Sequence, residues 1–219
     1  KDCSIWEYRD MYDHYTYSKF MCYIGVDRAI KIAQYMGKSE RIRDWESLRD
    51  EIKQDIIENA YDSKLKSFTM AYGNGKLDAS LLLMAYHDFL ERDSPMLVNT
   101  VKTIYDKLRK GYKVKRYDSK DDFGVSNNAF TVCSFWLVDA LYHIGEEKKA
   151  RNLFRKIIRK GNHLGLFSED LDIATGRMLG NFPQAYVHMA LINSSILLSE
   201  WSSKRKKIDW SQIPENKWF

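Results

Sequence analysis

The sequence predicts an all-α protein in which apolar helices alternate with amphipathic ones. Apolar side chains recur at helical spacing in seven segments. These segments are residues 15–36, 39–56, 77–90, 95–108, 129–144, 146–160 and 182–201. The 219 residues include only three prolines, as expected of a mostly helical chain. Such alternation favours a toroid, because inner helices are covered on both sides and outer helices on one.

Local signals mark where several of these helices begin and end. Gly37 closes the first helix, and Ser39 is expected to cap the second, more polar one. Ser94-Pro95 opens the helix over 95–108, and Gly111 stops it. A long loop, 111–128, then precedes the strongly apolar segment 129–144.

The degree of apolarity predicts which helices lie inside. The segments beginning at Leu77, Ala129 and Phe182 are apolar almost all round, so we expect them in the inner layer. The segments beginning at Ser39, Pro95 and Glu146 each carry a single apolar stripe, so they belong outside.

Composition argues against several classes of protein. The net charge of +5 is a small excess of 35 basic over 30 acidic residues, whereas nucleic-acid binding needs a concentrated basic face. The dense run Lys204–Lys207 falls in residues 202–219, which we interpret as a solvated basic and aromatic tail after a domain over 1–201. No apolar run is long enough to span a membrane.

The three cysteines, Cys3, Cys22 and Cys133, are too few for a disulfide framework and lack zinc-site spacing. They favour a reducing compartment, and we predict a cytoplasmic location. The chain opens without Met, close to a candidate catalytic Glu. We therefore expect it to be the C-terminal part of a longer protein.

Two acidic positions stand out as candidates for chemistry. Glu169 and Asp170 lie in a glycine-bounded loop ahead of the last apolar helix, and Glu7 follows Trp6 near the start of the chain. Desolvation beside a large aromatic side chain can keep a carboxyl group protonated. Two carboxylates at one mouth are what glycoside hydrolysis needs. From residue types alone, the ordinary interpretation of Glu7 is a surface carboxylate, and Glu169 and Asp170 could be acidic loop residues near a helix start.

Six sequence blocks carry a resemblance to a known family. They are Ile5-Trp6-Glu7, residues 14–19, 26–30, 77–84 and 133–140, and Leu179-Gly180-Asn181-Phe182-Pro183-Gln184-Ala185. In this order they resemble glycoside hydrolase family 15, the glucoamylase and glucodextranase family, over residues 4 to about 195. Fungal members carry a second Glu after the acid, whereas this chain has Tyr8 and then Arg9, as in the microbial branch that includes trehalases.

The resemblance implies a fold and a set of site residues. It implies a barrel of six inner and six outer helices, an (α/α)6 barrel, whose first helices are missing from this chain. It assigns Glu7 as general acid, with Trp6 helping to keep it neutral, and Glu169 as general base. It places Arg116 and Tyr117 in the sugar-binding loop, as a hydrogen-bond donor and a stacking platform. Trp6 is also a substrate-binding candidate, and weaker candidates are Arg9, His14, Lys19 and Tyr72.

Other conspicuous residues have simpler explanations. Trp136 lies in an apolar helix and is expected in the core, and His87 and His143 are expected to be structural. Asp78 falls at a helix start, where capping is a sufficient explanation.

The predicted function is an inverting, exo-acting glycosidase that releases glucose from α-linked glucosides, of the glucoamylase type. An α,α-trehalase of the same family is the alternative, and a carbohydrate-binding relative without turnover is a third. Such chemistry requires no metal or organic cofactor. The expected partners are the sugar substrate and an N-terminal part of the same protein, packed against helices 15–36 and 182–201.

Overall fold

The computed structural model describes residues 1–38, 40–122 and 124–199. Its helices are α1 (Thr16–Tyr35), α2 (Ile42–Ala60), α3 (Leu83–Tyr86), α4 (Pro95–Lys107), α5 (Thr131–His143), α6 (Glu147–Ile158) and α7 (Ala185–Leu198). A 3-10 turn, η1 (Ala79–Leu82), leads into α3. The predicted all-α class is confirmed. The expected cap Ser39 and the expected tail 202–219 lie outside the described residues.

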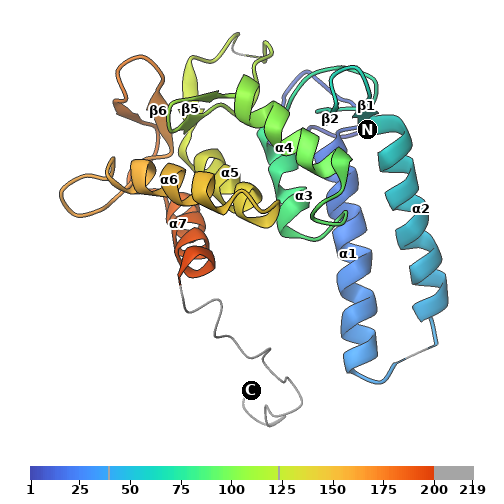
Figure 1. Cartoon of the computed structure of the whole chain (residues 1–219). Coiled ribbons are helices and arrows are strands. Elements are labelled where there is room, and N and C mark those ends of the chain that lie inside the picture. The colour runs from blue at the N-terminus through green and yellow to red at the C-terminus, as the bar shows by residue number, and fades with distance from the viewer. Residues whose placement is uncertain (39, 123, 200–219) are drawn as a thin grey trace.

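Helix α5 lies at the centre of the larger group of helices. Figure 1 shows α1 and α2 as a long antiparallel pair at one end, with α5, α6 and α7 at the other. Helix α5 packs against α6, α7 and the η1–α3 segment, and α2 packs against α1. Every residue of α5 from Thr131 to Leu141 is buried, so α5 is covered on all sides, as an inner helix should be. No described helix is both long and apolar enough to cross a membrane.

Helices α4 and α6 bury only one stripe each. In α6 the buried residues are Ala150, Leu153 and Ile157, at the spacing of a single helical face. In α4 a similar stripe runs along one face, with Leu97 and Val101 fully buried. Both helices therefore have the one-sided burial predicted for the outer layer.

The predicted continuous helix over 77–90 is wrong in extent. Only Ala79–Tyr86 is helical, first as η1 and then as the single turn of α3. The side chain of Asp78 accepts a hydrogen bond from Ser80 N and starts the turn late. Asp88 has φ +55°, in the left-handed region, which prevents the helix from continuing.

Within the described ranges, seven short strands interrupt the helices, and the sequence did not reveal them. They are β1 (Tyr61–Asp62), β2 (Ser67–Phe68), β3 (Arg109–Lys110), β4 (Lys113–Val114), β5 (Asn128–Phe130), β6 (Asp170–Asp172) and β7 (Met178–Leu179). Strands β1 and β2 pair, as do β3 and β4, and β5–β6–β7 form an antiparallel sheet. Because β5 pairs Phe130 with Asp170, helix α5 begins at Thr131 rather than at Ala129.

The sheet of β5, β6 and β7 fixes the backbone on either side of Glu169. Thr131 N donates to Glu169 O at 2.9 Å, and Glu169 N donates to Asn181 O at 2.9 Å. The backbone of Glu169 is therefore tied both to the start of α5 and to the segment that leads into α7.

Candidate active site

Glu7 lies on an exposed, tightly wound turn at the start of the chain. Its backbone N–H donates to Ser4 O at 3.2 Å, and Tyr8 N donates to Cys3 O at 2.9 Å. Glu7 has φ +55°, a left-handed conformation that costs a non-glycine residue about 1 kcal/mol or more. The turn keeps this shape because its neighbours are anchored, with Tyr8 only 3% exposed.

Trp6 anchors the turn from the other side. Its indole N–H donates to Asp78 Oδ2 at 3.0 Å. Its ring meets those of Tyr117 at 6.0 Å, Phe130 at 6.1 Å and Trp136 at 6.4 Å, measured between centroids. Trp136 is 6% exposed, in agreement with its expected core position. The residue before Glu7 is thus held by one hydrogen bond and three aromatic contacts.

Arg116 connects the Trp6 cluster to the second carboxylate loop. Its guanidinium carbon lies 4.2 Å from the ring centre of Phe130 and 5.9 Å from that of Trp6. The same guanidinium reaches Glu169 Oε1 at 3.6 Å and Asp170 Oδ1 at 3.0 Å. Residues that are far apart in sequence therefore meet around one arginine, a contact that the sequence did not predict.

The Glu169 carboxylate is held directly. Its Oε2 accepts from Asn181 Nδ2 at 2.8 Å and from Asn181 N at 3.2 Å, while its side chain remains 24% exposed. Gly180 is packed against it, because a Cβ built at Gly180 would lie 3.0 Å from Glu169 Oε2 and 3.1 Å from Glu169 Cβ. The carboxylate is therefore fixed in one orientation and still open to solvent.

Asp170, the neighbouring acid, has a different environment. Arg116 donates to both of its oxygens, at 3.0 and 3.3 Å, in a bidentate pair. Its side chain is 12% exposed. Burial raises the pKa of Asp170, although the charge and hydrogen bonds of Arg116 oppose this. Asp170 is thus committed to holding Arg116, which leaves Glu169 as the more accessible carboxylate.

Tyr117 lies in a buried aromatic cluster. It is 8% exposed, its ring centre is 5.6 Å from that of Tyr8, and its hydroxyl donates to Asp121 at 2.7 Å. A sugar-stacking role for Tyr117 stays a prediction, and this burial does not favour it.

The weaker candidates lie around the start of α1. His14 stacks on Tyr72 with 5.9 Å between ring centres, and the Tyr72 hydroxyl donates to Asp55 at 2.7 Å. Lys19 is half-buried in the first turns of α1. Arg9 is exposed, and its backbone N–H donates to Asp122 Oδ2 at 2.6 Å. Arg9 is two positions after Glu7, and Tyr72 follows Ala71, which packs in one cluster with Tyr8, so these two lie on the side of the Glu7 turn.

The sequence did not reveal three residues that shape this site. Asn181 and Gly180 hold Glu169, and Asp78 holds Trp6. Asn181 and Gly180 stood in a block used only for the family resemblance, so the signal was present without a role. Asp78 was explained as a cap, and the structure confirms that bond but adds a second one to Trp6.

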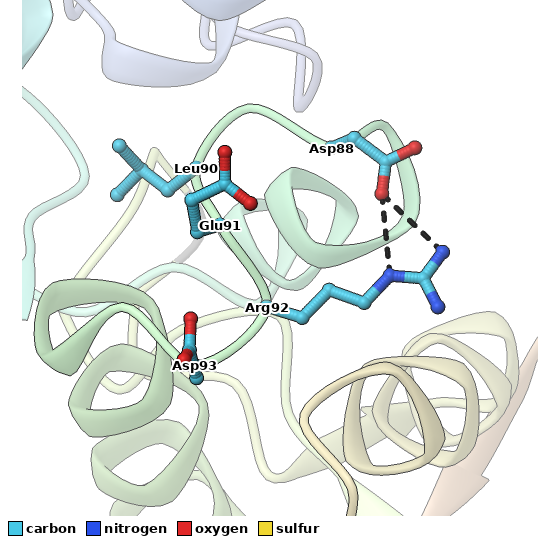
Figure 2. Close-up of a pocket in the computed structure, with 5 residues that line it drawn as sticks. All are labelled: Asp88, Leu90, Glu91, Arg92 and Asp93. Atoms are coloured by element: carbon cyan, nitrogen blue, oxygen red, sulfur yellow. Dashed lines mark hydrogen bonds and ion pairs between the residues drawn. The ribbon is translucent and has the colours of Figure 1, made fainter.

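A surface pocket elsewhere contains none of these residues. It lies in the turn after α3 and is lined by Asp88, Leu90, Glu91, Arg92 and Asp93 (Figure 2). Arg92 pairs with Asp88 at 3.4 Å, and both side chains are more than half exposed. Such a pair is strongly screened by solvent. The residues that line this pocket do not include an arginine held between carboxylates and aromatic rings, as Arg116 is.

The fold class is shared with glycosidases of known structure. A glycosidase variant solved in complex with glucose matches with a TM-score of 0.76 and 14% identity, over 90% of this chain and 55% of that one. The glucoamylase from Saccharomycopsis fibuligera matches with a TM-score of 0.67 and 12% identity, over 89% of this chain and 56% of that one. The fold is part of an (α/α)6 barrel, which confirms the prediction.

Sequence comparison then identifies the family. Residues 1–196 match Glycosyl hydrolases family 15, and the chain belongs to that family. It is 42% identical over 198 residues to the trehalase of Mycobacterium tuberculosis, which covers 89% of this chain and 29% of that protein. It is 37% identical over 205 residues to the trehalase of Thermoplasma volcanium, covering 93% and 33%. The chain thus spans about a third of the length of these relatives.

Proposed function

We propose that this chain carries the acid and base of an inverting α,α-trehalase. The observation that supports it most is the meeting of Trp6, Arg116 and Glu169 in one cluster, which brings the Glu7 turn toward the Glu169 loop. Membership of glycosyl hydrolase family 15 supports hydrolysis of a glycosidic bond. Similarity to relatives named as trehalases favours trehalose over the glucoamylase-type substrates that we first predicted from the sequence.

In this mechanism Glu7 donates its proton to the oxygen that links the two glucose units. The bond from that oxygen to one anomeric carbon breaks, and the second glucose leaves with its own configuration unchanged. Glu169 accepts a proton from a water molecule that attacks the same carbon from the opposite face. Inversion requires the two carboxyl groups to stand about 6.5–9.5 Å apart, so that the water fits between them.

The surrounding residues would orient this chemistry. Asn181 holds one oxygen of Glu169, so the other oxygen, on the side of Arg116, is the one available to the water. Arg116 is itself fixed by Asp170 and by the face of Phe130, which leaves its charge in a defined place for sugar hydroxyls.

We also propose that an N-terminal segment of the same protein completes the barrel. Two helices expose apolar side chains that the described residues do not cover. They are Met21 and Ile32 on α1 and Tyr186, Met189 and Ile192 on α7, each between 38% and 61% exposed. Exposed apolar patches of this kind mark contact surfaces. The relatives are about three times longer, so a segment long enough to cover both helices is expected.

This partner proposal is tested by comparing the 219-residue chain alone with the native protein, purified intact from its source. We expect the isolated chain to bind an apolar dye or to self-associate, and the native protein to do neither. A soluble monomer that unfolds cooperatively and binds no dye would contradict the proposal.

The function is tested by incubating the native protein with trehalose and, separately, with soluble starch. We expect glucose from trehalose, and proton NMR of the fresh products should show the α- and β-anomers in equal amounts. The attacked unit inverts to β, whereas the leaving unit stays α. Only α-glucose would indicate retention, glucose mainly from starch would favour the glucoamylase type, and no glucose from either would favour a binding protein.

A cytoplasmic location also remains a proposal. Cys3, Cys22 and Cys133 are free thiols in the structure, which is compatible with a reducing compartment. Fractionation of the source cells, with the native protein followed by antibody, would test it.

A further inference from the structure

Asp78 is a fully buried carboxylate whose oxygens are both used. Its Oδ2 accepts from Trp6 Nε1 at 3.0 Å, and its Oδ1 accepts from Ser80 N at 2.8 Å. Trp6 is 72 positions away in sequence. Burying a carboxylate is unfavourable unless hydrogen bonds compensate it, so both bonds are needed to keep this group inside.

Capping alone does not account for this residue. A cap uses one oxygen, and Ser, Thr or Asn supply it as well as Asp does. The turn that Asp78 caps is short, from Ala79 to Leu82. Both partners of Asp78 are N–H donors, so the ionised form satisfies them without conflict, whereas an added proton would face a donor. Burial raises the pKa of Asp78 to about 6, while the bonds from Ser80 and Trp6 oppose this shift.

The position of Asp78 links it to both sides of the candidate site. Through Trp6 it holds the residue that precedes Glu7, whose left-handed backbone needs anchoring from its neighbours. Its backbone also pairs with Tyr117, and Ala79 N donates to Arg116 O at 2.8 Å. The buried residues Asp78 and Ala79 therefore fix both the turn that contains Glu7 and the loop that carries Arg116.

We propose that Asp78 is a positioning residue that aligns the Glu7 carboxyl group for proton delivery by holding the indole of Trp6. This inference rests on the proposed function, because it takes Glu7 as the general acid. It assigns Asp78 no contact with substrate. Its effect should therefore depend on how strongly a substrate needs its leaving group protonated.

The test is Asp78→Asn in the native protein, with kcat/KM measured for trehalose and for α-glucosyl fluoride. The Asn side chain keeps the shape but turns one acceptor into a donor that faces an N–H. Fluoride leaves without protonation, so acid alignment matters little for it. We expect a loss of at least about 10-fold for trehalose, which is part of the typical general acid contribution of about 10²–10⁴-fold, and less than about 3-fold for the fluoride. Trp6→Phe should give the same selective loss, and the double variant should be no worse than either single one.

Asp139→Asn is the matched control. Asp139 is also buried, 6% exposed, and has one described side-chain bond, from Ser194 Oγ at 2.5 Å. It should change activity on both substrates equally, if at all. Equal losses for Asp78→Asn on the two substrates would overturn the inference. If Asp78→Asn does not fold, Trp6→Phe decides in the same way.

Glu7→Gln separates this inference from the proposed function. A selective trehalose loss in Glu7→Gln, together with equal losses in Asp78→Asn and Trp6→Phe, would reject only the role of Asp78. No selective loss in Glu7→Gln would reject Glu7 as the acid, and with it both proposals.

Discussion

The two candidate catalytic carboxylates are held in different ways. Glu169 follows a buried Ser168 and precedes a strand, and Asn181 and Arg116 contact its carboxylate directly. Glu7 lies on an exposed turn, and no described residue donates a hydrogen bond to its carboxylate. Only its neighbours, Trp6 and Tyr8, are anchored. The base is thus organised by contacts of its own, whereas the acid depends on indirect support.

This difference agrees with the chemistry that each group would perform. A base that activates water must be oriented whatever the leaving group is, so direct hydrogen bonds serve it well. A general acid must stay protonated, which needs a less solvated setting than the exposed turn provides. We expect the proposed N-terminal segment of the same protein to cover Glu7 when the barrel is complete.

Replacing Glu169 and Glu7 separately should give the largest effects and the clearest difference between the roles of the two carboxylates. We expect Glu169→Gln to lower kcat by about 10²–10⁴-fold on both trehalose and α-glucosyl fluoride, because water activation is needed for both. Glu7→Gln should cause a similar loss on trehalose but a much smaller one on the fluoride. Steady-state rates on the two substrates measure this. Equal sensitivity of the fluoride to both variants would contradict the assigned roles.

Gly180→Ala should disturb the base without touching the acid. The added Cβ would lie 3.0 Å from Glu169 Oε2, at a residue with φ +73°. We expect a loss of roughly 10-fold or more in kcat on both substrates, because orientation of a catalytic group is sensitive to small displacements. Circular dichroism and kinetics would measure fold and rate.

The matched control for this change is Gly165→Ala. Gly165 has φ +75° but nothing within 4 Å of the added Cβ, so it carries the same backbone strain without the contact to Glu169. We expect it to lower stability by about 1 kcal/mol and leave kcat unchanged. If Gly165→Ala lowers kcat as much as Gly180→Ala does, backbone strain rather than the Glu169 contact is responsible.

Asp139 on α5 offers a test of how α7 is attached to α5. Helix α7 follows Gly180 and Asn181, two residues that contact Glu169. The carboxylate of Asp139 accepts from Ser194 on α7, and burial raises its pKa from an ordinary 3.8 to about 7, although that bond opposes the shift. A carboxyl group whose pKa is raised by folding binds its proton more tightly in the folded state. The resulting stabilisation of the folded state is fully present below about pH 4, the pKa of the unfolded chain, and is lost as the pH rises to about 7.

Asp139→Asn should therefore remove part of the pH dependence of stability. Between pH 5 and pH 8 the variant should gain stability relative to the unchanged protein by up to about 3 kcal/mol. Urea unfolding at the two pH values measures it. The same difference between the two proteins at both pH values would show that Asp139 does not titrate in this range.

Local patterns predicted the helices well, and contacts distant in sequence account for what was missed. One-sided stripes such as Leu97–Val101–Ile104 in α4 are visible in sequence because their apolar residues recur every three or four positions, about once per helical turn. The pairing of Phe130 with Asp170 leaves no local trace, since each strand is two or three residues long. An apolar run over 77–90 looks helical, but the cap at Asp78 and the left-handed Asp88 shorten it.

The site shows the same division. Family motifs indicated Glu7, Glu169 and Arg116, and the structure brings Arg116 to Glu169. Residue type could not show that Asp78 bonds Trp6 or that Asn181 holds Glu169, because these are tertiary contacts. Such supporting residues become visible only when the loops are placed against each other.

Tyr72, next to the acid turn, should give the smallest effect and sharpen the comparison on that side. Its hydroxyl donates to Asp55 at 2.7 Å, while its ring stacks on His14. If this bond is purely structural, Tyr72→Phe and Asp55→Ala should each lower the free energy of unfolding by less than about 1 kcal/mol, because the bond is exposed, and KM for trehalose should not change. A rise in KM of several-fold in Tyr72→Phe but not in Asp55→Ala would show instead that the hydroxyl binds the sugar, as the family resemblance implied. The acid side would then contribute a direct substrate contact of its own, and its dependence on indirect support would be limited to Glu7.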